Sequence, residues 1–426
     1  MDDAALRSAN LAFAAAHLGE REERQPVHTV YGGAQLFAFD TAEKIGRVAR
    51  RALEQHAPDA GQLSAALGWP PSGELQQRVY ERVAARLERE PVEDFRIDFE
   101  DGYGNRPDAE EDGHATSVAG EVARGAREGT LPAVIGIRVK PLNEELRARS
   151  MRTLERFLGA LLDAAGGALP PGFIITLPKI TVSAQVAYFA GRLAELERKL
   201  GLAPESLRFE LMVETPQIII AADGRCLLPE LVSAGAGRVA AAHFGTYDYT
   251  AYLGITASEQ RMRHPACDFA KHAMQVSLAG TGIWLSDGST AILPVGDTPT
   301  VHAAWRLHYD DVMHSLRGGF YQGWDLHPAQ LVTRYAALYM FFLSGVQAAG
   351  ARLRNFVEKA AQATLVGDTF DDAATGQGLL NYFLRGINCG ALTESEAVAL
   401  TGVTLEELRS KSFLRILKNR SVRGET

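Results

Sequence analysis

The sequence has 426 residues, which is enough for one large barrel with an additional element or for two ordinary domains. Hydrophobic residues make up 46% of the chain and charged residues 23%, a composition typical of globular proteins that excludes a disordered chain. The formal net charge of −8 gives no electrostatic reason to expect binding to nucleic acid or to an anionic membrane surface.

The N-terminal segment, the apolar stretches and the cysteines all indicate a cytoplasmic protein. The first 26 residues lack a basic n-region and are too charged after Leu18 for a signal peptide. The most apolar stretch, residues 336–346, is too short to span a bilayer. The spacing of the three cysteines matches neither a zinc site nor a disulfide framework, which fits a reducing compartment.

Short β-rich segments alternate with helical patterns along the first 335 residues. This alternation is typical of parallel βαβ units. Eight strands within roughly 300 residues is the count expected for a (β/α)8 TIM barrel, although an open doubly wound sheet shows the same alternation. The eight segments are residues 28–31, 95–99, 134–139, 173–177, 208–213, 239–244, 282–286 and 319–325.

Only helical patterns follow residue 335, including those at residues 349–363 and 379–385. In Thr393–Glu396 and again in Thr404–Glu407, a threonine precedes a glutamate by three residues, the arrangement of a capping box at the start of a helix. We therefore predict an α/β barrel domain over residues 1–345 and a helical C-terminal extension over residues 346–426.

Charged and polar residues follow six of the eight predicted strands. One charged residue after a strand is usually part of a solvated turn, but six such strand ends are harder to explain in this way. In a barrel the C-terminal ends of all strands open onto one face, where active sites are built. The residues are Asp98, Glu100 and Asp101 after strand 2, Arg138 and Lys140 after strand 3, Lys179 after strand 4, Glu214 and Thr215 after strand 5, Gly245, Thr246 and Asp248 after strand 6, and His327 after strand 8.

Carboxylates gathered on one face repel one another unless cations neutralise them. The sequence offers Arg138, Lys140 and Lys179 and, we infer, a metal ion. Oxygen ligands without cysteine indicate Mg²⁺ or Mn²⁺, and Glu214 and Asp248 on adjacent strands suit such an ion. The ion would chelate a 2-oxo-acid and stabilise an enolate as a carbon–carbon bond breaks. Arg138 would bind a substrate oxygen through both arms of its guanidinium group.

Six short motifs resemble those of the citrate lyase β-subunit and malyl-CoA lyase superfamily, and they occur in that family's order. The resemblance covers residues 28 to about 340 and implies a pyruvate/phosphoenolpyruvate-type barrel. It implies cleavage or condensation of carbon–carbon bonds in oxo- and hydroxy-acids, often as coenzyme A thioesters. The motifs are DFED (98–101), IRVK (137–140), LPKI (177–180), VETP (213–216), FGTYD (244–248) and LHP (326–328).

The resemblance also implies roles for individual residues. It places the metal-binding glutamate and aspartate at Glu214 and Asp248, the substrate-contacting arginine at Arg138, and the strand-2 acids at Glu100 and Asp101. It implies a homo-oligomer, a trimer or hexamer, in which the C-terminal segment can close over a neighbouring subunit's site. The residues that we expect to bind the substrate are Asp98, Thr215, Gly245, Thr246 and His327, and the acids that the C-terminal segment could contribute are Asp368, Asp371 and Asp372.

The sequence departs from the family in two places. The loop after strand 1, residues 31–35, contains no arginine, and a long segment, residues 255–277, separates strands 6 and 7. Both places bear on whether a coenzyme A thioester is recognised.

Several alternatives stay open at the level of the sequence. Lys179 could form a Schiff base or could orient Glu100 and Asp101, and His327 could shuttle a proton or cap a turn. The leading function is a metal-dependent lyase or aldolase. The alternatives are other enolate chemistry, such as thioester hydrolysis or phosphoenolpyruvate phosphotransfer, and a non-catalytic barrel that acts as a binding subunit.

Overall fold

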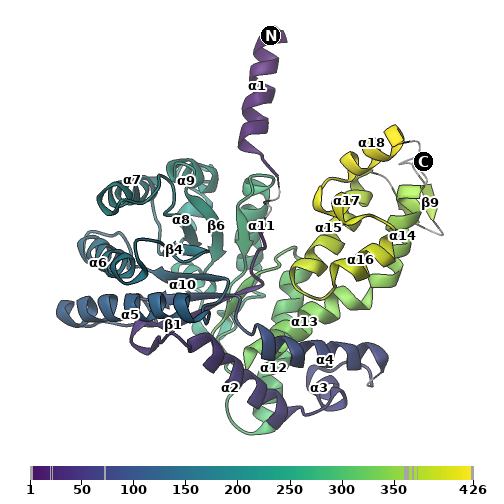
Figure 1. Ribbon diagram of the computed structural model, residues 1–426, viewed down its shortest axis with the longest axis horizontal. Coiled ribbons are helices and arrows are strands. Elements are labelled where there is room, and N and C mark those ends of the chain that lie inside the picture. Colours follow the sequence, from purple (N-terminus) through teal and green to yellow (C-terminus); the bar gives the residue numbers. More distant parts are fainter. Residues whose placement is uncertain are drawn as a thin grey trace.

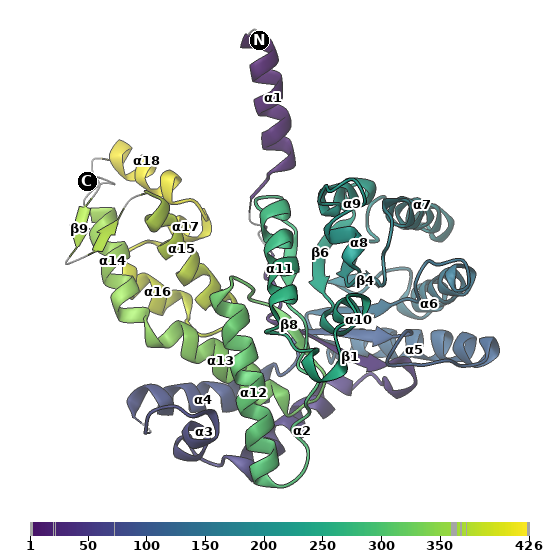
Figure 2. The same cartoon turned by 180° about the vertical axis from the view of Figure 1, so that it is seen from behind.

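Eight strands alternate with helices in the computed structural model (Figures 1 and 2), which describes residues 3–19, 21, 23–71, 73–358, 364–366, 369–371 and 373–423. The strands are β1 (His28–Gly33), β2 (Asp94–Asp98), β3 (Val134–Arg138), β4 (Phe173–Leu177), β5 (Phe209–Val213), β6 (Val239–Phe244), β7 (Trp284–Ser286) and β8 (Gly323–Asp325).

Helices follow each strand in turn. Those that belong to the barrel are α2 (Thr41–His56), α3 (Ala60–Leu67), α4 (Glu74–Arg89), α5 (Asp108–Glu128), α6 (Arg147–Ala165), α7 (Ser183–Leu200), α8 (Pro216–Ile219), α9 (Leu228–Ala234), α10 (Thr246–Tyr252), α11 (Pro265–Leu278), α12 (Thr298–Arg317) and α13 (Gln330–Ser344), with short 3-10 turns η1 (Ala34–Leu36) and η2 (Ala257–Glu259).

The sheet is a closed parallel barrel. Its strands follow the order β7-β6-β5-β4-β3-β2-β1-β8, and every neighbouring pair is parallel. The two end strands are joined just beyond β7, where the Asp287 N–H donates to the Gln322 carbonyl at 2.8 Å and the Trp324 N–H to the Gly288 carbonyl at 3.0 Å. The predicted (β/α)8 fold is therefore confirmed, and the open doubly wound sheet is excluded.

The alternation of apolar and polar side chains along the strands explains why these segments form a barrel. On β2, Phe95 and Ile97 are buried apolar residues, whereas Arg96 between them forms an ion pair with Glu210 on β5 at 2.7 Å. Because β2 and β5 are not neighbours in the sheet, this pair spans the barrel interior. Period-2 patterning thus directs apolar side chains toward the surrounding helices and polar ones inward.

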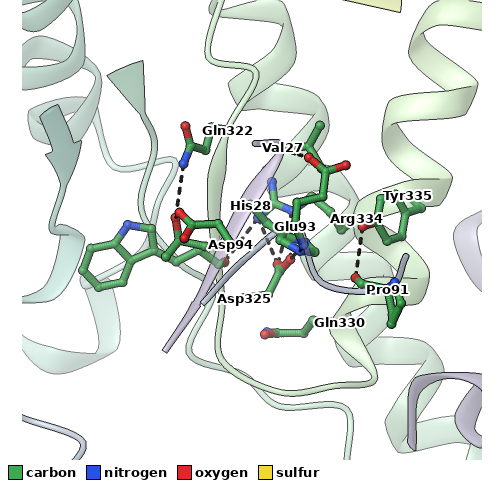
Figure 3. A network of polar contacts seen from close by, with 12 residues as sticks. Val27, His28, Pro91, Glu93, Asp94, Gln322, Asp325, Gln330, Arg334 and Tyr335 are labelled. Carbon is green, nitrogen blue, oxygen red and sulfur yellow. Dashed lines mark hydrogen bonds and ion pairs between the residues drawn. The ribbon is translucent and has the colours of Figure 1, made fainter. Parts of the chain in front are cut away.

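A buried polar network fastens β8 to its surroundings (Figure 3). The Asp325 carboxylate accepts hydrogen bonds from Arg334 of α13 and lies 3.0 Å from His28 Nδ1 of β1 and 3.1 Å from His308 Nε2 of α12. The His28 Nε2 accepts the Glu93 backbone N–H at 3.1 Å, so its Nδ1 carries the proton that faces Asp325. Arg334 and His28 hold the pKa of Asp325 well below its usual range despite its burial.

The C-terminal region forms a helical lobe beside the barrel (Figure 1), with its ribbon running from light green to yellow. Glu396 ties it to Arg78 and Arg82 of α4 at 2.6 Å each, and Asn388 bonds Gln25 just before β1. The lobe comprises α14 (Val346–Glu358), α15 (Ala373–Asn388), α16 (Glu394–Thr401), α17 (Leu405–Arg409) and α18 (Phe413–Arg423), together with a small antiparallel pair, β9 (Thr364–Val366) and β10 (Thr369–Asp371).

Three expectations concern parts of the chain outside the eight strands. The extension is helical as predicted, with one small antiparallel pair, β9–β10, in addition to its helices. Residues 255–277 form η2 and α11, which is the helix that a barrel requires between β6 and β7. Asp368 and Asp372 lie outside the described residues, and Asp371 ends β10.

No helix in the described part of the chain is long and apolar enough to cross a membrane. The N-terminal helix α1 (Asp3–Ala16) stands away from the barrel in both views (Figures 1 and 2), and none of its residues is buried.

Candidate active site

Arg138 and Asp98 form a buried ion pair at the C-terminal ends of β3 and β2. The two residues are direct partners in the parallel register. Arg138 donates from Nε to Asp98 Oδ1 at 2.7 Å and from Nη2 to Oδ2 at 2.5 Å. Asp98 also accepts the backbone N–H groups of Glu100 and Gly102. Asp98 therefore positions Arg138, and its own acceptors are already used by the protein rather than left for a substrate.

The same geometry limits which atoms of Arg138 can face a substrate. Because Nε and Nη2 are both directed at Asp98, the guanidinium group cannot bind a substrate oxygen through both of these atoms. Its Nη1 lies 3.3 Å from Glu100 Oε2 and is the arm closest to the remaining acids. Burial lowers the pKa of Arg138, but Asp98 and Glu100 raise it well above its ordinary value, so the group stays charged.

Lys179 extends from the end of β4 into a cluster of acids. Its Nζ donates to Glu100, lies 2.9 Å from Asp101 Oδ2 and lies 3.5 Å from Asp248 Oδ2. Burial alone would lower the pKa of this ammonium group, but Glu100 and Glu214 raise it above its usual value. A Schiff base requires a neutral amine, so the geometry favours the orienting role over the Schiff-base alternative.

Lys179 also has an unusual backbone, with a φ of 49° in the left-handed region. Non-glycine residues with this conformation cost free energy and persist where the surrounding structure holds them. Here the Lys179 N–H donates to Glu214 Oε1. The turn after β4 thus presents both its backbone donor and its ammonium group to the acids.

Glu214 is the buried acid of the site and Asp248 the more exposed one. Glu214 ends the β5 segment with a relative exposure of 1%, whereas the Asp248 side chain, in the first turn of α10, is 34% exposed. Burial, and then the negative charge of Asp248, raise the pKa of Glu214 to about 8. The pair therefore lacks enough positive charge to keep Glu214 ionised at neutral pH.

The charges of the whole cluster fit a divalent cation. Two cations, Arg138 and Lys179, face five carboxyl groups, so full ionisation of the cluster would leave a surplus of three negative charges; the carboxyl groups are Asp98, Glu100, Asp101, Glu214 and Asp248. Within the described ranges no three His, Cys, Asp or Glu residues are gathered to hold a metal by themselves. Two carboxylates with water and substrate oxygens are nevertheless a donor set that Mg²⁺ accepts. Glu214 and Asp248 are the residues that would hold it.

Gly245 and Thr246 lie beside Glu214. A Cβ at Gly245 would stand 2.6 Å from Glu214 Cβ and 2.7 Å from its Oε2, so only glycine lets β6 approach this carboxylate. Thr246 is buried, and its Oγ1 has no hydrogen-bond partner in the part of the chain that the structure describes. Both residues remain suitable for lining a ligand site.

Three other predicted residues are used by the protein itself. The Thr215 hydroxyl is buried and donates to the Ile180 carbonyl. His327 accepts the Ala329 N–H at Nδ1 at 3.2 Å at the start of α13, as expected of a turn cap. Lys140 donates to the Phe99 carbonyl and pairs with Glu111 at 3.2 Å, away from the acid cluster.

Two aromatic residues at the site were missed from the sequence. The Arg138 guanidinium lies over the Tyr31 ring at 4.8 Å, and Trp324 packs against Tyr31 with ring centroids 4.6 Å apart. Tyr31 directly precedes Gly32-Gly33 at the end of β1, and this position at a strand end could have identified it as a site residue from the sequence. Trp324 lies within β8, whose position among the strands was predicted but whose inward face was not.

The model of a domain of unknown function (DUF6986) matches residues 6–416. A search of curated proteins finds no significant match.

Among solved structures, a citrate lyase from Burkholderia xenovorans LB400 is 21% identical, with a TM-score of 0.57 over 77% of this chain and 94% of that chain. A lead(II) complex of malate synthase from Haloferax volcanii is 16% identical, with a TM-score of 0.48 over 95% and 94% of the two chains. The citrate lyase match confirms the predicted resemblance to that superfamily at the level of the barrel fold.

Proposed function

The chain belongs to the family of the domain of unknown function DUF6986, and we propose that it is a metal-dependent carbon–carbon lyase or aldolase. Its substrate is a 2-oxo- or hydroxy-acid, free or as a coenzyme A thioester, and the reaction passes through a metal-stabilised enolate. The proposal includes Mg²⁺ or Mn²⁺ as cofactor and a cytoplasmic homo-oligomer, a trimer or hexamer, without nucleic-acid or membrane partners.

One observation supports the proposal above all others. Glu214 is buried beside Asp248, and burial, together with the negative charge of Asp248, raises the pKa of its carboxyl to about 8. Perturbed carboxyls of this kind are concentrated at functional sites. Glu214 and Asp248 lie at the C-terminal face of a parallel barrel, where barrel enzymes carry their active sites.

The residues around this pair have roles that follow from their contacts. A bound Mg²⁺ would supply a Lewis acid for the carboxylate and oxo groups of the substrate. Arg138 offers Nη1 to an oxygen on which negative charge develops, while Asp98 holds the guanidinium plane in place. Lys179 keeps its proton and orients Glu100 and Asp101.

We also propose that residues 1–345 form the catalytic domain and residues 346–426 an extension to it. Asp98 ends β2. The other four acids of the cluster and its two cations follow in the chain, from the loop after β2 to α10. The extension contacts α4 and the segment before β1, through Glu396 and Asn388. The charged groups named in the cluster therefore all come from the proposed catalytic domain.

Calorimetric titration tests the proposal. Protein treated with EDTA and protein reloaded with Mg²⁺ or Mn²⁺ are each titrated with pyruvate, oxaloacetate, glyoxylate and acetyl-CoA. We expect at least one oxo-acid to bind only in the presence of metal. Product analysis with the ligand that binds then separates carbon–carbon cleavage from thioester hydrolysis and phosphotransfer.

Two substitutions test the metal ligands. Glu214→Gln and Asp248→Asn should each abolish metal-dependent binding while leaving the circular dichroism spectrum unchanged, because the amides keep the shape but lose the charge. Glu128→Gln, at the far end of α5, is the matched control and should bind as the unmodified protein does. Normal metal-dependent binding by both site variants would contradict the metal assignment.

A further inference from the structure

The N-terminal helix α1 carries an apolar face that the chain itself does not cover. None of its residues is buried, and Leu6 and Phe13 are 52% and 64% exposed. The Phe13 ring stacks on His17 of the same segment, with centroids 4.0 Å apart. Leu6, Ala9, Phe13 and Ala16 follow one another at intervals of three, four and three residues, which places them on one side of the helix.

Helix α11 carries a second exposed face of the same kind. Phe269 is 56% exposed and Val276 83% exposed. His272 and Ala279 are exposed as well, the latter just beyond the helix end. Phe269, His272, Val276 and Ala279 are again separated by three, four and three residues. On the opposite side, Cys267, Ala270 and Met274 are buried in the core, so the exposed stripe faces away from the barrel.

The two helices meet end to end. The Gly19 N–H donates to the Gly280 carbonyl at 2.8 Å, which joins the C-terminal end of α1 to the C-terminal end of α11. From this junction α1 points away from the rest of the molecule, beyond the end of α11 (Figures 1 and 2). Each helix has 14 residues and is therefore about 21 Å long.

We propose that two copies of this chain associate about a two-fold axis near this junction, with α1 of each copy packed on the exposed stripe of α11 of the other. A two-fold axis there places the two helices alongside one another in the same direction, because both have their C-terminal ends at the junction. The equal lengths and equal spacings then bring four residue pairs into register, namely Leu6 with Phe269, Ala9 with His272, Phe13 with Val276, and Ala16 with Ala279 of the second copy.

The pairing is physically suited to a helix–helix contact. Positions spaced by three and four residues form the seam along which two helices pack. Leu6 and Phe13 each fall opposite a large apolar residue of α11. Ala9 and Ala16, at the other two positions, leave room for the helices to approach closely. The contact is isologous and occurs twice, so it doubles the area buried by one helix pair, toward the roughly 1,600 Å² of a standard stable interface.

Other occupants of these faces fit less well. A helix that lies on a membrane surface usually carries several lysines and arginines, whereas α1 contains one, Arg7. Folding of α1 back onto its own α11 would require the chain to reverse at residues 17–19. The segment after it is held in place by Arg21, which lies over the Trp284 ring at 4.1 Å and donates to the Ala240 carbonyl.

Light scattering of the full chain after size-exclusion chromatography tests the proposal. We expect a mass that is an even multiple of 46.1 kDa, which agrees with the hexamer of the proposed function and not with the trimer. Phe13→Asp and Val276→Asp should each halve that mass, because a charge in the seam must be desolvated. Leu11→Asp is the matched control, since Leu11 is 62% exposed on the other side of α1 and should leave the mass unchanged. A monomer, a trimer, or a mass that neither seam variant alters would overturn the proposal.

A disulfide distinguishes the second copy from the same chain. In the variant Ala9→Cys with His272→Cys, made in a Cys226→Ser background, the two thiols of one chain lie on opposite sides of the junction, beyond the 7 Å or less that a disulfide allows between Cα atoms. We expect mild oxidation to give a covalent dimer on a non-reducing gel. Leu11→Cys with His272→Cys should give none. A disulfide within one chain would show fold-back of α1 and would also overturn the proposal.

Discussion

Charged side chains fill the barrel interior beneath the candidate site. Arg96 pairs with Asp94 and Glu210 and also donates to the Thr176 hydroxyl at 3.0 Å. Burying ions is costly unless each is paired and hydrogen-bonded, and this arginine has three partners from three strands. The interior polar layer is thus satisfied around Arg96. It supports the strand ends that carry Arg138 and Glu214.

His243 of β6 is the titratable group in this layer with the clearest consequence for stability. It is 1% exposed, and its Nε2 lies 3.3 Å from Glu210. Burial lowers the pKa of His243 to about 4, against an ordinary value of 6.5. When the pH falls from 6.5 toward 4, the unfolded chain therefore binds a proton at this residue before the folded chain does.

We predict that this residue makes the protein less stable in mild acid. The stabilisation from neutral His243 is fully present above pH 6.5 and is lost as the pH falls to 4, by up to about 3 kcal/mol. His243→Gln should flatten the fall in the free energy of unfolding over this range, as measured by urea denaturation at several pH values. Between pH 7 and 8 the variant should leave the slope unchanged. An equally steep acid loss in the variant would contradict the prediction.

At the scale of the residue, the sequence predicted which groups meet but not what each one does. Arg138, Lys179, Glu100, Asp101, Glu214 and Asp248 were all expected at one face, and the structure brings them together. Their division of labour depends on distances that no spacing encodes. The Nε and Nη2 of Arg138 are directed at Asp98, and only the folded barrel shows that Nη1 is the nitrogen that Asp98 does not engage.

At the scale of the element, two glycines show how differently one residue type acts. Gly136 lies in β3, where a Cβ would stand 1.7 Å from the Ile174 carbonyl oxygen of β4. Gly120 lies in α5, and nothing stands within 4 Å of its Cβ position. The first glycine permits close pairing of two strands just below Arg138, whereas the second only loosens a helix.

We predict opposite effects for the two alanine substitutions. Gly136→Ala should destabilise the protein by about 1–3 kcal/mol or more, because packed backbone must move. Gly120→Ala should stabilise it by about 0.5–1 kcal/mol, because alanine loses less conformational entropy in a helix. Chemical denaturation of both variants measures the difference. If Gly136→Ala were neutral, the close approach of β3 and β4 would not be needed for the fold.

The order of the elements could be read from the sequence better than their boundaries. All eight strands were predicted in the correct order, but β7 and β8 are only three residues long each and begin later than expected. Residues 255–277 were expected only as a long segment between strands 6 and 7 that departs from the family. Only the folded barrel shows that this segment contains α11, the helix between β6 and β7.

At the scale of the whole molecule, Asp325 connects four elements. It joins β8 to β1 through His28 and to α13 through Arg334 (Figure 3). It also joins β8 to α12 through His308. All four side chains are buried. This carboxylate therefore holds the last strand of the barrel against the first one and against the helices outside it.

We predict that Asp325→Asn destabilises the protein by about 3–5 kcal/mol, because Arg334 would be left as a buried charge without its carboxylate. The matched control is Asp310→Asn on α12, where a partly exposed acid pairs with Arg306 one turn earlier. That change should cost no more than about 0.5 kcal/mol. Thermal denaturation of the two variants checks both values, and a small effect at Asp325 would contradict the connecting role.

The sequence by itself determined the alternation of strands and helices, the parallel sheet that this alternation indicates, and the strand ends at which the acids gather. These properties follow from local patterning, since side-chain periodicity and strand-end position are both encoded along the chain. Only the tertiary structure decided the closure between β7 and β8, the pairing of Arg138 with Asp98, the ring contact between Tyr31 and Trp324, and the exposed stripes of α1 and α11. Each of these depends on distances between residues far apart in the sequence, which local patterns do not specify.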